Sequence, residues 1–130
     1  MEPIDTGAIA QLLALYCHIV DDKQWDRLGD VFAADGSMTV ANMYATHTGL
    51  AELRVLYSET MNHPLAHHST SVVVLDHLGD TAQVVSKWVT VRADGGAGTG
   101  VYRDHLVRTA AGWRVHARLA TPVVRPTKTA

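Results

Sequence analysis

The stretch LYCHIVDDKQWDRLGDVFAADG, residues Leu15–Gly36, decides how this chain folds. Apolar residues before it and inside it recur at helical spacing, and they predict an amphipathic helix with Thr6 as its N-cap. Two acidic residues, Asp21 and Asp22, interrupt this pattern, so the first helix should end there. A second, short helix is expected next, and its apolar face would consist of Trp25, Leu28, Val31 and Phe32.

The remainder of the chain changes from mixed to mostly β structure. A short strand pair is expected at 37–40 and 44–47, and a third helix from about Leu50 to Thr60, before Pro64. The order ααββαββββ is typical of an α+β fold, in which helices cover one face of an antiparallel meander. Alternating Val, Thr and aromatic residues between short turns predict the last four strands, at 69–75, 81–92, 100–109 and 113–124.

Length and composition limit the classes of protein to consider. The chain has 130 residues, enough for one hydrophobic core, so we expect a single domain over 1–130 with a frayed tail at 125–130. The formal net charge is -2, and no basic stripe for nucleic acid is present. No apolar run reaches the roughly 20 residues that span a bilayer. The single cysteine, Cys17, allows no internal disulfide, and a cytoplasmic protein is expected.

Two motifs that suggest a ligand are better explained without one. The run GGAGTG at 95–100 is rich in glycine, but a β-rich segment follows it where a phosphate loop needs a helix, so a flexible hairpin is predicted. The histidines His63, His67 and His68 are close in sequence, but Pro64 disfavours a helix that would align them. Adjacent residues of a strand also point to opposite faces. We therefore expect no metal site, and no cofactor motif is seen.

Asp21 and His67 each have a structural and a chemical interpretation. Asp21 follows an apolar helical stripe that must face the core, although capping of the next helix explains it as well. His67 begins a β run, where it points either to solvent or inward. The chain holds eight histidines, a number that suggests metal or proton chemistry, and their spacing argues against metal. Trp88, Tyr102, Asp104 and Arg118 are strand residues that can likewise be either surface residues or part of a site.

Three stretches, read together, resemble a known family. They are Leu15–Gly36, the segment HHSTS at 67–71 that enters a β run, and GVYRDHLVRT at 100–109 followed by GWRV at 112–115. In order and spacing they resemble the SnoaL-like branch of the NTF2-like superfamily, which includes scytalone dehydratase and the lindane dehydrochlorinase. The resemblance runs from about Ile4 to Val124. It implies a cone-shaped α+β barrel, in which a curved antiparallel sheet wraps around helices and leaves an apolar pocket open at one end.

The resemblance also implies a catalytic pair. In the dehydratase and dehydrochlorinase members, an aspartate after the first helix orients a histidine that acts as general base, and Asp21 and His67 match these two residues. Arg118 matches a pocket arginine of the dehydrochlorinase. The substrate-binding residues expected on this basis are Tyr16, His47, Trp88, Tyr102, Asp104 and Arg118. The side chains expected to exclude water are those of Trp88, Met38, Met43 and Leu15.

Proton transfer on a small molecule is the function that the resemblance implies. We expect a cofactor-independent lyase, isomerase or cyclase that acts on a mostly apolar, oxygenated molecule of polyketide or steroid type. A homodimer or homotrimer is expected, with neither nucleic acid nor a membrane as partner. One alternative is a non-catalytic binding or dimerisation domain of the same fold, and another is an epoxide hydrolase that holds water between Asp21 and Asp104. An open pocket and a hydrogen-bonded Asp21–His67 pair would favour the enzyme.

Overall fold

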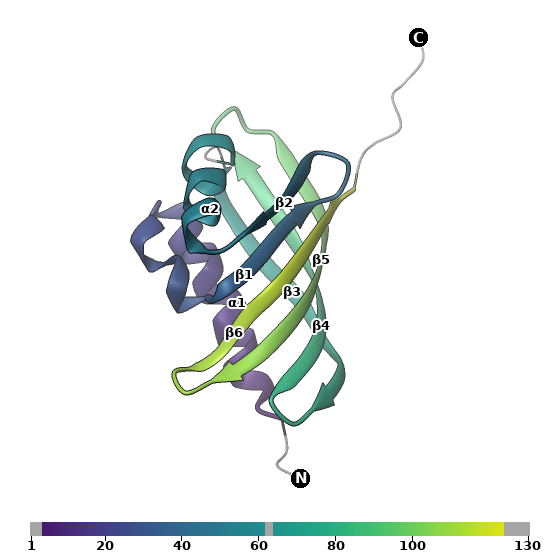
Figure 1. Cartoon of the computed structure of the whole chain (residues 1–130). Coiled ribbons are helices and arrows are strands. Elements are labelled where there is room, and N and C mark those ends of the chain that lie inside the picture. Colours follow the sequence, from purple (N-terminus) through teal and green to yellow (C-terminus); the bar gives the residue numbers. More distant parts are fainter. Residues whose placement is uncertain (1–3, 62–63, 124–130) are drawn as a thin grey trace.

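The computed structural model describes residues 4–61 and 64–123 (Figure 1). The predicted frayed tail at 125–130 and His63 lie outside these residues. None of the described helices has both the length and the apolar character that crossing a membrane requires. The elements in chain order are α1 (Thr6–Asp21), a 3₁₀ helix η1 (Trp25–Asp30), β1 (Phe32–Val40), β2 (Tyr44–Thr48), α2 (Leu50–Val55), a π-helical turn η2 (Leu56–Thr60), β3 (Pro64–Leu78), β4 (Thr81–Arg92), β5 (Ala97–Thr109) and β6 (Gly112–Pro122).

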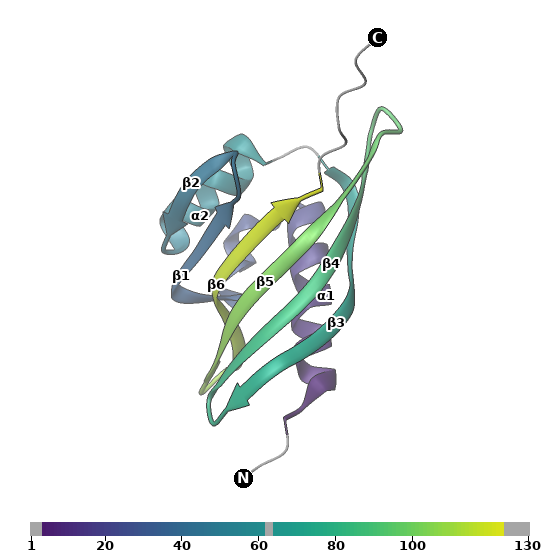
Figure 2. The ribbon, with the colours of Figure 1, turned by 90° about the vertical axis from the view of Figure 1, so that its right-hand side faces the viewer.

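The six strands form one curved sheet in the order β2-β1-β6-β5-β4-β3. Neighbouring strands are antiparallel except β1 and β6, which pair in parallel. The sheet does not close on itself, because β2 and β3 form its two edges. The helix α1 lies against one face of the long strands, whereas α2 lies beside β1 and β2 (Figures 1 and 2). This arrangement confirms the predicted α+β fold, in which a bent sheet wraps around N-terminal helices.

Two local predictions are wrong in the N-terminal third of the chain. The N-cap of α1 is Asp5 and not Thr6, because the Asp5 carboxylate accepts a hydrogen bond from the Ala8 N–H at 2.9 Å. The predicted second helix ends early, at Asp30, and Phe32 already belongs to β1. Apolar spacing does not separate these two states, because an inward residue such as Phe32 is buried in either of them.

The hydrophobic core lies between α1 and the sheet. The inward positions of β4 alternate with exposed ones, as a strand with one buried face requires. The helix predicted at 50–60 is present as α2 and η2. Side chains with almost no exposed surface include Ile9, Leu13, Tyr16 and Ile19 from α1, Leu53, Leu56 and Tyr57 from α2 and η2, and Val84, Leu106 and Val115 from the sheet.

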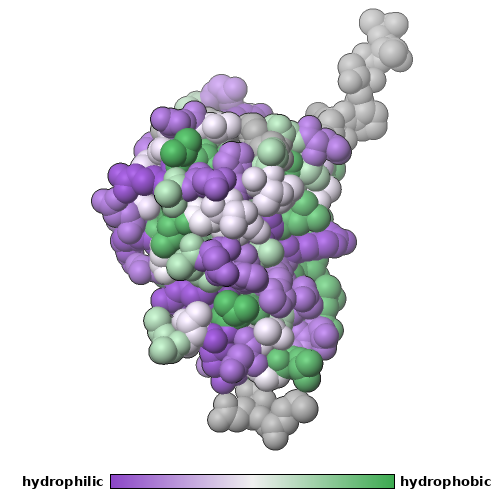
Figure 3. Space-filling model, viewed as in Figure 1, coloured by the Kyte–Doolittle hydropathy of each residue, from purple (hydrophilic) through white to green (hydrophobic). Residues whose placement is uncertain are grey.

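The outer surface has a mixed character. On the face of the molecule in Figure 3, hydrophilic side chains surround small and separate hydrophobic areas. Scattered apolar residues of this kind are normal on the surface of a monomer. These separate areas do not identify an interface on this face, so the homodimer or homotrimer expected from the sequence stays a prediction. Exposed large apolar side chains on the strands are Val73, Leu75, Leu78, Val89, Val91 and Leu119.

One ion pair is buried completely in the core. Asp104 on β5 faces Arg118 on β6 in the register of the sheet, and neither side chain has any exposed surface. Arg118 Nε donates to Asp104 Oδ1 at 2.7 Å, and Nη2 donates to Oδ2 at 2.9 Å. Burial lowers the pKa of Arg118, but the charge and hydrogen bonds of Asp104, with Tyr102 and Tyr16, together hold this pKa well above its usual value. The guanidinium also lies 3.7 Å from the ring centroid of Tyr102 and 4.3 Å from that of Tyr16.

Removing one member of this pair should destabilise the fold strongly. In Asp104→Asn, the Arg118 cation loses its counter-charge inside the core, so we expect the free energy of unfolding to fall by about 3–5 kcal/mol. Equilibrium urea unfolding, followed by circular dichroism, measures the change. The matched control is Asp35→Asn, because Asp35 forms an exposed pair with His116 at 3.3 Å and should affect stability little. Equal unfolding midpoints for the two variants would contradict the role given to the buried pair.

Candidate active site

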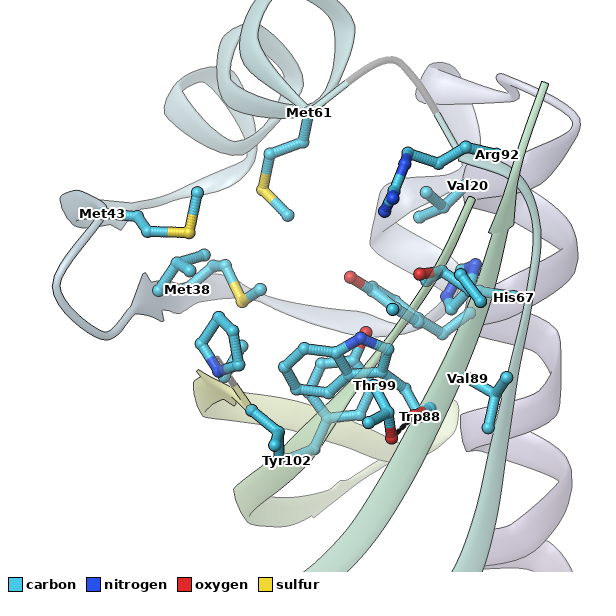
Figure 4. A pocket seen from close by; sticks show the side chains of 18 of the residues that line it. Val20, Met38, Met43, Met61, His67, Trp88, Val89, Arg92, Thr99 and Tyr102 are labelled. Carbon is cyan, nitrogen blue, oxygen red and sulfur yellow. Dashed lines mark hydrogen bonds between the residues drawn. The ribbon is translucent and has the colours of Figure 1, made fainter. Parts of the chain in front are cut away.

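A cavity of about 940 Å³ opens at one end of the sheet. Its volume suits a small ring compound, since ligand pockets usually measure about 300–1,000 Å³. Figure 4 shows Met38, Met43 and Met61 on the side that faces His67 and Arg92. The described lining is mostly apolar and consists of Tyr16, Val20, Met38, Val40, Met43, Tyr57, Met61, His67, Trp88, Val89, Thr90, Arg92, Gly96, Ala97, Gly98, Thr99, Tyr102, Ala120, Pro122 and Val123.

His67 lines the cavity and is paired with the carboxylate of Asp21, which is not among the described lining residues. Asp21 is the last residue of α1, and His67 lies near the start of β3. Asp21 Oδ1 is 2.7 Å from the imidazole Nδ1 of His67, and Oδ2 accepts a hydrogen bond from the backbone N–H of the same residue at 2.8 Å. The side chains are 3% exposed for His67 and 16% for Asp21. A single carboxylate therefore joins the end of the first helix to the beginning of the third strand.

The bond to Asp21 sets the tautomer of the His67 ring. A carboxylate accepts hydrogen bonds but does not donate them, so the proton of the neutral ring lies on Nδ1. The other ring nitrogen, Nε2, makes no hydrogen bond to a residue in the described part of the chain. His67 lines the cavity, and Nε2 is its ring nitrogen with an unused lone pair.

Burial lowers the pKa of His67 from its ordinary value of 6.5. The hydrogen bond and the charge of Asp21 oppose this shift, whereas the cation Arg118 adds to it. The net direction is downward, so the ring is neutral at neutral pH and able to accept a proton. The ring of Tyr16 packs edge-on against the imidazole, with 5.5 Å between the centroids, and shields it from water.

Two tyrosine hydroxyls meet in the same cavity. Tyr16 from α1 and Tyr57 from η2 both line it, and their hydroxyl oxygens are 2.7 Å apart. One hydroxyl donates to the other. Burial raises the pKa of Tyr16 and holds that of Tyr57 well above 10.0, so both phenols stay protonated at neutral pH. The cavity lining therefore combines a neutral imidazole, that of His67, with protonated phenols.

Trp88 and Tyr102 provide a broad aromatic surface in the cavity (Figure 4). Their ring centroids are 4.5 Å apart. Trp88 on β4 pairs with Gly100 on β5. A Cβ at Gly100 would overlap the indole of Trp88 and approach the backbone oxygen of Thr121 to 2.6 Å, so this position accepts only glycine. The absence of a side chain at Gly100 therefore determines where the indole lies.

Three of the predicted substrate-binding residues are not part of the described lining of the cavity. Asp104 and Arg118 bind each other on the far side of the tyrosine rings, so Arg118 acts on the cavity through its charge. His47 on β2 directs Nδ1 to a backbone carbonyl oxygen at 2.8 Å instead. Leu15 also lies outside the lining and packs against the core. The predicted residues that do meet in the cavity are Tyr16, Met38, Met43, His67, Trp88 and Tyr102.

Three further lining residues, Tyr57, Met61 and Arg92, are missed by the sequence analysis. For two of them, the spacing from an inward-pointing neighbour in the sequence predicts the same direction. Arg92 follows Trp88 by an even number of strand positions, so both side chains lie on one face. Tyr57 follows Leu53 by about one helical turn. Met61 lies just past the end of η2, where no periodicity applies.

Solved structures with the same fold include three proteins from Novosphingobium aromaticivorans. One is described as a candidate aromatic ring hydroxylase, with 28% sequence identity and a TM-score of 0.81 over 96% of this chain and 94% of that chain. The second is an NTF2-like protein with a cystatin-like fold, with 25% identity and a TM-score of 0.79 over 92% and 82%. The third is described as a candidate scytalone dehydratase, and at 17% identity, with a TM-score of 0.75 over 92% and 84%, it shows the fold alone.

The family is shown by a match along most of the sequence. No curated protein matches this chain significantly. The family model of the SnoaL-like domain, in contrast, matches residues 2–119, a range that includes both Asp21 and His67. The chain therefore belongs to the family of SnoaL-like domains, as the resemblance of its three stretches predicts.

Proposed function

We propose that this protein is a cofactor-independent lyase, isomerase or cyclase in which His67 is the general base. Its substrate would be a small, mostly apolar, oxygenated molecule that loses a proton next to a carbonyl or a leaving group. The observation that carries the proposal is that His67, which lines an open cavity of about 940 Å³, is hydrogen-bonded to Asp21 behind it. Membership of a family with the same expected pair supports the assignment.

The reaction would begin at Nε2 of His67. This nitrogen takes the proton, the C–H bond breaks, and its electron pair moves towards the carbonyl, whose oxygen becomes negative. Asp21, 2.7 Å from Nδ1, stabilises the imidazolium that forms. A hydroxyl of the Tyr16–Tyr57 pair, both of which line the cavity, would donate to the developing oxyanion.

The product of the reaction depends on where the abstracted proton goes and on what the enolate does next. If it returns to a different carbon of the enolate, a double bond shifts. If it goes to a leaving hydroxyl group, water departs and a new C=C bond remains. If the enolate carbon attacks a second carbonyl, a ring closes and the proton goes to the new alkoxide. Each outcome balances without an oxidant or a reductant, so acid and base groups of the chain suffice.

The two alternatives fit the geometry less well. Epoxide hydrolysis would need a water held between Asp21 and Asp104, but both oxygens of Asp104 bind Arg118, and Asp104 is not among the described lining residues. A non-catalytic binding domain would use the same cavity. It would have no need for a buried imidazole and carboxylate, whose removal from water costs free energy.

Proton abstraction can be measured without knowledge of the natural substrate. We expect the protein to accelerate deuterium exchange at the α-carbons of β-tetralone in heavy water, followed by proton NMR. Because a positioned general base contributes about 10²–10⁴-fold, His67→Ala should lower the exchange rate at least 100-fold. Asp21→Asn should lower it less, since the base is kept and only its orientation and imidazolium partner are weakened.

A second histidine–aspartate pair in the chain provides the control for this experiment. His116 and Asp35 form an exposed pair with an Nε2–Oδ2 distance of 3.3 Å, so His116→Ala should leave exchange unchanged. Full exchange by folded His67→Ala would show that His67 is not the base. If β-tetralone binds to the unaltered protein but exchanges no faster than in buffer, the non-catalytic binding domain is the better assignment.

The pH dependence of exchange follows from the pKa of His67. The base must be neutral, so kcat/KM should rise with pH, with an apparent pKa below 6.5, and then stay level through neutral pH. Asp21 opposes the downward shift of this pKa, so Asp21→Asn should move the rising limb to still lower pH. Initial rates of β-tetralone exchange across a pH series measure both limbs. A limb above 6.5 in the unaltered protein, or one that moves upward in Asp21→Asn, would contradict the assignment.

A further inference from the structure

Arg92 is the only residue with a permanent charge in the described lining of the cavity. It is the last residue of β4, and its side chain is 42% exposed. In Figure 4 its guanidinium reaches into the cavity from the same side as His67 and faces the three methionines. The proton transfer proposed above makes no use of this cation.

The strand β4 places Arg92 at the outer end of a row of inward side chains. Trp88 is buried, whereas Thr90 and Arg92 are half-buried, so the row becomes more polar towards its end. Thr90 is the register partner of His67. At about 3.3 Å per strand residue, Arg92 lies about 7 Å further along the strand than Thr90. A ligand with a reacting carbon near His67 and one ring or two beyond it would therefore reach Arg92.

The glycines of the β4–β5 turn make room for this side chain. A Cβ at Gly96 would overlap Nη2 of Arg92, and a Cβ at Gly98 would lie 3.5 Å from Nη1. The guanidinium therefore lies across the turn at Gly96, in space that a side chain at this position would share. Within the run GGAGTG, which has no role in the proposed reaction, Gly96 is thus the position that leaves space for the Arg92 guanidinium.

The N–H donors of the Arg92 guanidinium are not used by the described residues. Its nearest acid is Asp94, with 3.8 Å between Nε and Oδ1, which is too long for a hydrogen bond. Asp94 instead accepts from the Gly96 N–H at 2.8 Å and is 76% exposed, so the ion pair is a weak one. In the part of the chain that the structure describes, the Arg92 side chain makes no hydrogen bond. A planar cation with free N–H groups at the edge of an apolar cavity is suited to binding a carboxylate.

We propose that Arg92 binds an anionic end of the substrate, and that the natural ligand is an apolar ring compound that carries a carboxylate. The proposal rests on the proposed function, because it assumes that the substrate occupies this cavity. A monoanion fits better than a phosphate, since the described lining offers one fixed cation and no second one. Arg92 is thus a specificity-determining residue, while the chemistry stays with His67.

Two matched probes test this inference: naphthalene carboxylate and its methyl ester, which share the ring system and differ in charge. Isothermal titration calorimetry should give about tenfold tighter binding of the carboxylate by the unaltered protein, as expected for a charge-assisted contact. In Arg92→Gln this preference should disappear, through weaker binding of the carboxylate and unchanged binding of the ester. Arg103→Gln is the control, because Arg103 is exposed on β5 between two inward residues and should change neither affinity. Added salt should reduce the preference of the unaltered protein.

Each outcome separates this inference from the proposed function. Equal affinity for both probes in the unaltered protein, or a carboxylate preference that survives Arg92→Gln, would overturn the role of Arg92. Loss of the preference in both Arg92→Gln and Arg103→Gln would show a general effect of net charge and would overturn it as well. If the role of Arg92 is overturned but β-tetralone exchange still depends on His67, the proposed function is kept and only this inference fails. If exchange fails but the carboxylate preference depends on Arg92, the cavity is an anion-selective binding site and the inference stands.

Discussion

Two hydrogen bonds accepted by one carboxylate organise the functional end of this molecule. Asp21 binds the backbone N–H of His67 with one oxygen and the imidazole Nδ1 with the other. The backbone bond fixes where β3 begins relative to the end of α1, and the ring bond fixes which ring nitrogen carries the proton. In the proposed reaction the same contact serves both folding and chemistry. A buried imidazole without it would leave Nδ1 unpaired at a cost of about 1–3 kcal/mol.

Burial favours a neutral imidazole and protonated tyrosines at the cavity, and the buried Arg118 charge supports only the first of these. Arg118 is held in the core by Asp104, with Tyr16 and Tyr102 lying over its guanidinium. Burial is the main cause of the lowered pKa of His67 and of the raised pKa of Tyr16; Arg118 adds to the first shift and only moderates the second. An arginine that is not among the lining residues therefore takes part in setting the proton affinity of the groups that are.

The helices and strands of this fold can be predicted from the sequence, because the patterns that determine them lie within short segments. Helical spacing identifies the buried face of α1, and the turns between the last four strands mark a meander. The juxtaposition of Asp21 and His67 follows from the resemblance to the family and not from spacing, since 46 positions separate them in the sequence. His47 and Arg92 show the limit of such reading. The inward or outward direction of a side chain near a strand end depends on the partner strand and on the turn, as with the glycines that accommodate Arg92.

The tautomer of His67 is the most direct test of this account. A proton–nitrogen correlation NMR spectrum of protein labelled with nitrogen-15 in histidine distinguishes the two neutral forms of each ring and the imidazolium. We predict that His67 at neutral pH is neutral, with its proton on Nδ1 and an unprotonated Nε2. A proton on Nε2, or a doubly protonated ring at neutral pH, would contradict the claim that Asp21 presents His67 to the cavity as a base.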